Sequence, residues 1–151
     1  MKVRDAMTSG VRIASPDETI QDAARMMADI DAGVLPVGQN DRLVGMITDR
    51  NIAIRAVAKG MGPNARVGDV MTREVRYCFD DEDVDHVRQN LADQQIRRVP
   101  VVDRDKRLVG ILSLSDLALA GMSTAMGETL ADISRPGGRH SQSGDGHARA
   151  M

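Results

Sequence analysis

Residues 96–117 read IRRVPVVDRDKRLVGILSLSDL, and this stretch indicates how the chain folds. Two apolar runs, 99–102 and 108–112, flank a charged link, so we predict two neighbouring short strands. The second run leads directly into Ser113 and Asp116. A serine followed three residues later by a carboxylate is a typical start of a capped helix. The stretch therefore predicts two strands and then a helix.

Two interpretations of this helix start follow from the residues. In the first, Ser113 and Asp116 form an ordinary capping box. In the second, they form a cradle for a ribose and a phosphate together with Arg97 and Arg98 on the adjoining strand. Only one of the two arginines can face the phosphate, because successive strand side chains point to opposite faces. Both roles can coexist, since a ribose can replace the capping partner.

A similar pattern occurs earlier in the chain. VRDAMT at residues 3–8 returns 64 residues later as VGDVMT, and LVG at 43–45 returns 65 residues later. Matches in the same order indicate two copies of one supersecondary unit. We predict a first copy at residues 1–60, a linker at 61–66, a second copy at 67–122, and a C-terminal extension at 123–151 that is flexible from residue 136.

Both copies predict the same order of elements. For the first copy we expect a strand at 11–14, a helix that Ser15 caps and Gly33 ends, strands at 34–37 and 43–47, and a helix at 51–59. For the second copy we expect a strand at 75–79, an Asp80-capped helix and the elements of 96–117. The C-terminal extension is expected to add a last helical turn at 128–133. A βαββα unit of this size cannot bury a sheet face alone, and two copies in tandem can pack sheet against sheet or helix against helix and share a core.

Composition limits the possible functions. A net charge of −2 and only two aromatic residues, Tyr77 and Phe79, provide neither a basic field nor a stacking surface for nucleic acid. No apolar run approaches the ~20 residues of a membrane span, and the N-terminus lacks a hydrophobic signal core. The single cysteine, Cys78, predicts a buried and inert thiol in a reducing compartment. We therefore expect a cytoplasmic protein that binds neither nucleic acid nor membranes.

Catalytic and metal-binding patterns are missing from the sequence. It contains no nucleophile elbow, no glycine-rich phosphate loop and no Cys/His spacing typical of zinc. His86 is expected on an exposed helix face, and His140 and His147 fall in the tail. We predict a protein that is not an enzyme and has no metal and no obligatory cofactor.

The repeated pattern V-x-D-x-M-T, then P-V, then L-V-G, two apolar residues and T/S-x-x-D resembles the cystathionine β-synthase (CBS) domain, which occurs in tandem as a Bateman module. The resemblance covers roughly Val3–Met122. It implies an α/β (α+β) fold of two tandem βαββα repeats packed as a pseudo-twofold pair, and a homodimer of four repeats. It also implies a regulatory module that binds an adenosine nucleotide (AMP, ADP or ATP) in a cleft between the repeats and signals to an unknown effector protein. The alternative is a ligand-independent structural or stress-related dimer that binds proteins.

The same resemblance implies which residues bind the ligand. Residues 111–116 resemble the ribose-binding end of the last repeat in the gamma subunit of AMP-activated protein kinase. By that resemblance Asp116 accepts hydrogen bonds from two ribose hydroxyls, with Ser113 and Ser115 nearby, and Arg98 holds the α-phosphate. The adenine is expected to lie against Ile111, Thr8, Ile13 and Ala32.

The first copy departs from this pattern. Asn51 stands where Asp116 belongs, and Val34 stands where Arg98 does. An amide can accept one hydrogen bond but carries no charge, and charge-assisted bonds are roughly twice as strong as neutral ones. We therefore predict one competent cleft and a weaker second cleft formed by Thr48, Asn51 and Arg50.

Overall fold

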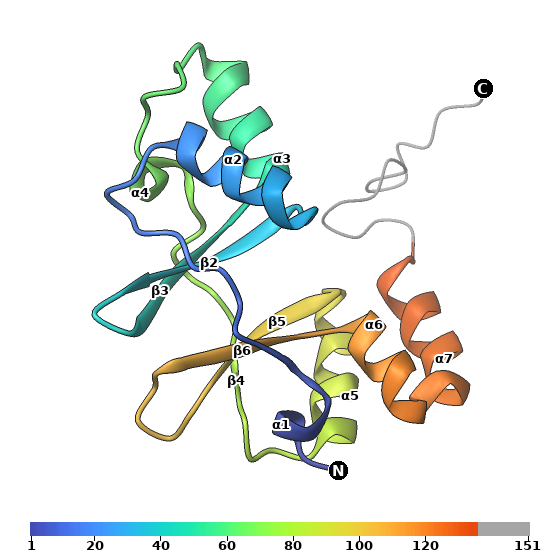
Figure 1. The fold of residues 1–151 in the computed structure, drawn as a ribbon. Coiled ribbons are helices and arrows are strands. Elements are labelled where there is room, and N and C mark those ends of the chain that lie inside the picture. Colours follow the sequence, from blue (N-terminus) through green and yellow to red (C-terminus); the bar gives the residue numbers. More distant parts are fainter. Residues whose placement is uncertain (136–151) are drawn as a thin grey trace, which may run out of the picture. The chain divides into compact units, whose positions relative to one another are not determined.

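The computed structural model describes residues 1–135, so the predicted flexible tail, His140 and His147 lie outside the described residues. The described chain forms two compact units of helices and strands (Figure 1). Unit 1 comprises Met1–Ser9, Tyr77–Val101 and the described residues from Val109 onward, and unit 2 comprises Gly10–Arg76 and Val102–Leu108. The predicted mixed α/β class is confirmed.

Unit 2 is built around one β-hairpin. Its elements are α2 (Ile20–Ile30), β2 (Val34–Gln39), β3 (Arg42–Thr48), α3 (Asp49–Asn51), the π-helical turn η1 (Ile52–Ala56), the 3-10 turn η2 (Val57–Lys59) and α4 (Val67–Val70). Strands β2 and β3 pair antiparallel, and single bridges add Ala14 beside Val37 and Thr72 beside Met46. The predicted hairpin and the two predicted helical regions of the first copy are therefore present.

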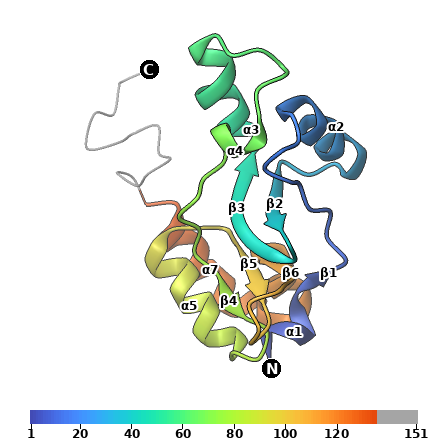
Figure 2. The ribbon, with the colours of Figure 1, turned by 90° about the vertical axis from the view of Figure 1, so that its left-hand side faces the viewer.

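Unit 1 has the same plan, but its sheet has four strands where that of unit 2 has two. Its elements are α1 (Val3–Ala6), β1 (Thr8–Ser9), β4 (Cys78–Phe79), α5 (Val84–Gln94), β5 (Arg98–Val102), β6 (Leu108–Ser113), α6 (Leu114–Leu117), the π-helical turn η3 (Ala118–Met122) and α7 (Ser123–Ile133). The strands form one sheet in the order β1-β6-β5-β4, drawn from a second side in Figure 2. The strands and the helix start predicted from residues 96–117 are confirmed.

The two compact units do not coincide with the two sequence repeats. The V-x-D-x-M-T segment of the first repeat lies in unit 1, where Thr8 pairs with Ile111 of β6. The corresponding segment of the second repeat lies in unit 2, where Thr72 pairs with Met46 of β3. Each unit therefore completes its sheet with a segment from the other repeat.

A glycine in each repeat makes room for the exchanged segment. A Cβ atom on Gly110 would lie 2.6 Å from the carbonyl oxygen of Thr8, and one on Gly45 would lie 2.7 Å from that of Thr72. Real Cβ atoms do not approach backbone oxygens this closely. The glycine of the repeated L-V-G motif is thus required by the close passage of another backbone rather than by its own torsion angles.

Each unit has its own aliphatic core. In unit 2, Ile20, Ala23 and Met27 of α2 are buried, as the helical spacing predicts, whereas Ile30 at the end of the same face is 39% exposed. The core of unit 2 comprises Ala14, Ile20, Ala23, Met27, Leu35, Val37, Ile47, Ala56, Val67, Val70 and Met71. The core of unit 1 comprises Val3, Cys78, Val84, Val87, Leu91, Val99, Val101, Leu112 and Leu117.

The predicted start and end of α2 were wrong. Thr19, not Ser15, caps this helix, because its hydroxyl accepts from the Asp22 amide at 3.1 Å while the Asp22 carboxylate accepts from the Thr19 amide. Ser15 instead begins a preceding turn, in which its amide donates to the Glu18 carboxylate at 2.7 Å. The helix ends at Ile30, three residues before Gly33, and the next residue, Asp31, takes the left-handed conformation common after a helix end.

Other predicted boundaries also shift. Asp83 rather than Asp80 caps α5, because its carboxylate accepts from the Asp85 amide. The predicted strands at 11–14 and 75–79 shrink to a bridge at Ala14 and to the two residues of β4, since only these residues reach a partner strand. The predicted helical turn at 128–133 is the second half of a longer helix, α7.

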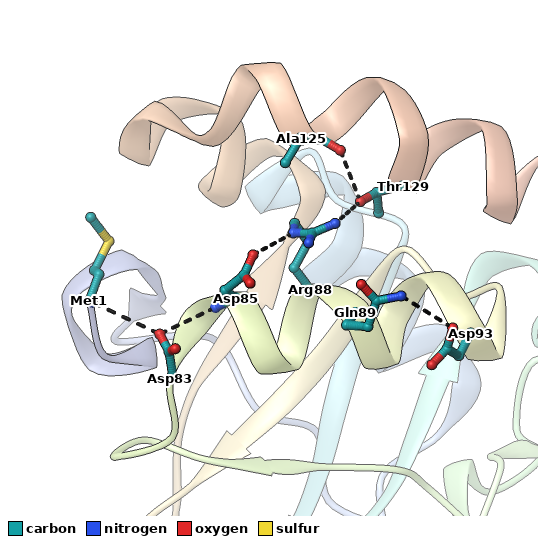
Figure 3. A network of polar contacts seen from close by, with 8 residues as sticks. All are labelled: Met1, Asp83, Asp85, Arg88, Gln89, Asp93, Ala125 and Thr129. Carbon is teal, nitrogen blue, oxygen red and sulfur yellow. Dashed lines mark hydrogen bonds and ion pairs between the residues drawn. The ribbon is translucent and has the colours of Figure 1, made fainter.

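Helix α7 packs on α5 through a buried polar contact (Figure 3). The guanidinium of Arg88 donates to the Asp85 carboxylate and to the hydroxyl of Thr129, at 2.9 Å in both cases. The Thr129 hydroxyl, on a fully buried side chain, donates in turn to the carbonyl of Ala125 at 3.2 Å. These paired donors and acceptors fix α7 against α5 without an unsatisfied buried group in this part of the chain.

The buried thiol of Cys78 makes a testable case of pH dependence. Burial raises the pKa of Cys78 from 9.0 to about 12, and the nearby Glu82 and Asp80 carboxylates contribute smaller parts of this increase. Because the folded protein favours the neutral thiol, this group stabilises the fold below pH 9, and the contribution is lost as the pH rises toward 12. We expect iodoacetamide to leave Cys78 unmodified at pH 8 in the folded protein and to alkylate it rapidly in denaturant.

Mass spectrometry after timed quenching measures this difference. A Cys78→Ala variant controls for alkylation elsewhere, and its stability should fall less steeply above pH 9 than that of the unsubstituted protein. Equal alkylation rates with and without denaturant would show that the thiol is accessible as a thiolate in the fold.

Candidate functional site

The helix start after β6 in unit 1 is a complete capping box. The Asp116 amide donates to the Ser113 hydroxyl at 3.2 Å, and the Ser113 amide donates to the Asp116 carboxylate Oδ2 at 3.0 Å. The capping interpretation of these two residues is therefore confirmed. This box uses only one oxygen of the carboxylate, so the structural role leaves the other oxygen for further contacts.

The second carboxylate oxygen faces the exchanged segment. The Thr8 hydroxyl donates to Asp116 Oδ1 at 2.9 Å, and Thr8 is held there because it pairs with Ile111 on β6. Asp116 Oδ1 thus already accepts a hydrogen bond from an alcohol. Each carboxylate oxygen has two lone pairs, so a ligand hydroxyl can join or replace that of Thr8.

The start of β5 lies beside the same helix start. The Leu114 amide donates to the carbonyl of Arg97 at 3.1 Å, which places the backbone before Arg98 next to Ser113. Both arginine side chains are exposed, and neither forms an ion pair within residues 1–135. Unit 1 therefore brings together Thr8, Ile111, Ser113 and Asp116 with the backbone that carries Arg98.

Three other residues predicted to bind the ligand are less closely tied to this group. Ser115 is exposed in the first turn of α6. Ile13 is 43% exposed, Ala32 is half-buried, and both belong to unit 2. Their contact with a ligand stays a prediction.

The corresponding helix start in unit 2 has the same cap but different chemistry. The Asn51 amide donates to the Thr48 hydroxyl at 2.9 Å, and the Thr48 amide donates to the Asn51 side-chain oxygen at 3.1 Å. The oxygen expected to accept from a ligand is therefore used by the cap, and Asn51 presents its Nδ2 donor instead. Arg50 is exposed, and its backbone amide donates to the Asp49 carboxylate at 2.8 Å.

Sequence reasoning missed a guanidinium at this second site. Arg55 Nη1 contacts the carbonyls of Val70 and Met71 at 3.2 and 3.1 Å and the hydroxyl of Thr72 at 3.1 Å. Thr72 occupies the position in the second repeat that Thr8 occupies in the first. Arg55 has no counterpart, because the residue 65 positions later is Ala120. Extending the comparison of the repeats by one helical turn past Asn51 would have revealed this difference.

These features define a tandem-repeat α/β protein whose two repeats exchange a short segment and each present a capped helix start. The chain belongs to the CBS domain family, since the family model matches residues 3–57 and 67–123. It is 41% identical over 133 residues to the CBS domain-containing protein YhcV of Bacillus subtilis, covering 87% of this chain and 94% of that protein.

Solved structures support the same assignment. The crystal structure of Hypoxic Response Protein I with two coordinated zinc ions matches with a TM-score of 0.72 and 37% identity, covering 79% of this chain and 98% of that one. The CBS domain pair of MJ0100, in complex with 5-methylthioadenosine and S-adenosyl-L-methionine, matches with a TM-score of 0.71 and 30% identity. CBSX2 in complex with AMP matches with a TM-score of 0.71 and 26% identity. Both of these matches cover 82% of this chain and 98% of the other.

Within residues 1–135, no three His, Cys, Asp or Glu side chains are grouped so that they could hold a metal ion. No helix in this range combines the length and apolar character needed to cross a bilayer.

Proposed function

We propose that this protein is a regulatory module that binds an adenosine nucleotide (AMP, ADP or ATP) at the helix start of unit 1, and that it acts on an effector protein rather than catalysing a reaction. MJ0100 was solved in complex with 5-methylthioadenosine and S-adenosyl-L-methionine, and CBSX2 in complex with AMP, which supports an adenosine compound as the ligand. Asp116, Ser113 and Ser115 are proposed to bind the ribose, and Arg98 the α-phosphate. Ile111, Thr8, Ile13 and Ala32 are proposed to contact the base.

The observation that carries this proposal is the contact between Thr8 and Asp116. A carboxylate oxygen that already accepts from an alcohol at 2.9 Å has the geometry that a ribose hydroxyl needs. Asp116 is held in place by its own capping box, so little side-chain entropy is lost when a ligand binds. The exposed Arg98 nearby provides a guanidinium for phosphate.

A thermal-shift screen of the full chain tests the proposal. AMP, ADP, ATP, S-adenosylmethionine, 5-methylthioadenosine and NAD are added separately, with inorganic phosphate as the control. A ligand at about a hundred times its dissociation constant should add ~2.7 kcal/mol of stability. If none of the adenosine compounds raises the melting temperature, the nucleotide proposal is wrong.

The exposed apolar residues favour a second candidate function, a ligand-independent dimer that binds proteins. Leu119 is 88% exposed on η3, and its repeat equivalent Ile54 is 44% exposed on η1. A second copy of the chain that packed on these positions would remove both aliphatic side chains from water. We therefore propose that these two positions lie in the interface of a homodimer of four CBS repeats, with or without nucleotide.

Charge at this surface should prevent dimer formation. We expect Leu119→Arg to shift the protein from dimer to monomer in sedimentation velocity, because a buried unpaired guanidinium in the interface is costly. Leu130→Arg is the matched control, since Leu130 is 48% exposed on α7. A Leu119→Arg protein that remains as dimeric as the control would place the interface elsewhere.

A further inference from the structure

The helix start of unit 2 presents hydrogen-bond donors where that of unit 1 presents an acceptor. In unit 1, Asp116 Oδ1 accepts from Thr8. In unit 2, Asn51 has its side-chain oxygen in the cap, which leaves Nδ2 as the free end of the amide. The Thr72 hydroxyl accepts from Arg55, and its own hydrogen has no acceptor within residues 1–135.

The Arg55 guanidinium adds two more donors. Only Nη1 of this group is bonded to the described protein. Nε and Nη2 have no partner there, and no buried side-chain nitrogen or oxygen of the described residues lacks one, so both atoms reach solvent. The three contacts of Nη1 hold the group in place on a half-buried side chain. A fixed guanidinium with a free edge is suited to an anion.

No carboxylate neutralises this guanidinium among the residues that the structure describes. Arg55 forms no ion pair in residues 1–135. The carboxylate of Asp49, on the same helical segment, lies against Gly33 and accepts from the backbone amide of Arg50. Relative to unit 1, unit 2 has lost the negative charge of Asp116 and gained a positive charge where Ala120 stands.

We propose that Arg55, Thr72 and Asn51 form an anion site that takes a phosphoryl group, and that the second site is therefore not a weak copy of the ribose site. All three side chains have free hydrogen-bond donors and none has a charged acceptor, which suits the acceptor oxygens of a phosphate better than sugar hydroxyls, whose own hydrogens need acceptors. The site lies in unit 2 and does not depend on the adenosine site at Asp116.

Calorimetric titration with inorganic pyrophosphate tests this proposal on the full chain. We expect one saturable site per chain, retained in Asp116→Asn and weakened at least tenfold in Arg55→Gln. Arg25→Gln, which removes an exposed arginine on α2 of the same unit, is the charge-matched control and should bind as the unsubstituted protein does. Absence of saturable binding, or equal binding by Arg55→Gln and Arg25→Gln, would show that Arg55 only anchors the backbone after α4.

A second variant keeps the test decisive if Arg55→Gln does not fold. Asn51→Asp should preserve the cap, because Asp116 makes the same cap in unit 1, while it places a carboxylate beside the proposed anion. We expect at least a tenfold loss of pyrophosphate affinity, and unchanged affinity would contradict the proposal. Competition by AMP but not adenosine in the Asp116→Asn protein identifies a nucleotide phosphate as the occupant, whereas failure of AMP to compete identifies a free phosphate.

Discussion

Replacing Asp116 by Asn should reduce adenosine nucleotide affinity about 10–100-fold while the protein remains folded, because hydrogen bonds to a charged group contribute ~1.5–3 kcal/mol. The substitution removes the charge but keeps an oxygen for the Ser113 amide. Unit 2 already shows that an asparagine serves this cap, since Asn51 accepts from the Thr48 amide at 3.1 Å. Isothermal titration with AMP measures the loss.

Asparagine is a sharper substitution here than alanine. Asp116→Ala would remove the capping box as well as the ligand contact, and loss of a cap costs roughly 0.5–2 kcal/mol of stability. The Asp83→Asn variant provides the matched control, because it removes a capping carboxylate from α5 of the same unit, keeps a side-chain oxygen for the Asp85 amide and lies outside the proposed ribose site. If Asp83→Asn lowers AMP affinity as much as Asp116→Asn does, the loss comes from the charge of a helix cap and not from a ligand contact.

Gly110→Ala should destabilise the protein by about 2–3 kcal/mol, in the upper part of the range for inserting a methyl group into a packed region. The added Cβ would lie 2.6 Å from the carbonyl of Thr8 and 2.9 Å from the sulfur of Met7. The methionine can move, but the carbonyl belongs to the paired strand β1. The segment must therefore shift away from β6 or lose its pairing.

Urea unfolding followed by circular dichroism measures this change. Gly62→Ala is the matched control, because a Cβ at Gly62 meets nothing within 4 Å, and alanine there should be neutral or stabilising by up to about 1 kcal/mol. Gly45→Ala should behave like Gly110→Ala, since its Cβ meets Thr72 in the same way. Equal midpoints for Gly110→Ala and Gly62→Ala would show that the exchanged segment adapts without cost.

The hairpins and the helix start at Ser113 could be predicted because their signals are local. Apolar runs, a polar turn and a serine three residues before a carboxylate all act over a few residues. The N-caps at Thr19 and Asp83 were missed because each lies within four residues of another good capping residue, Ser15 or Asp80. Local propensity alone does not choose between neighbouring caps.

The exchange of segments could not be predicted from the repeat. A repeated motif predicts that two copies fold alike, but the sequence pattern gives no preference for pairing Val3–Thr8 with β3 or with β6. Arg55 was missed for a related reason, because its partners Val70, Met71 and Thr72 come from the other repeat. Contacts between segments far apart in sequence leave no periodic signal.

The exchange of Val3–Thr8 and Val67–Thr72 makes each half of the protein dependent on the other for a complete sheet. A protease cut within 61–66 would fall inside unit 2 and not between the two compact units. A truncation there would leave a lone repeat that lacks the exchanged segment beside the glycine of its L-V-G motif. Such a fragment can recover that edge only by capturing the same motif from another molecule, so a single repeat made on its own should associate with further copies of itself.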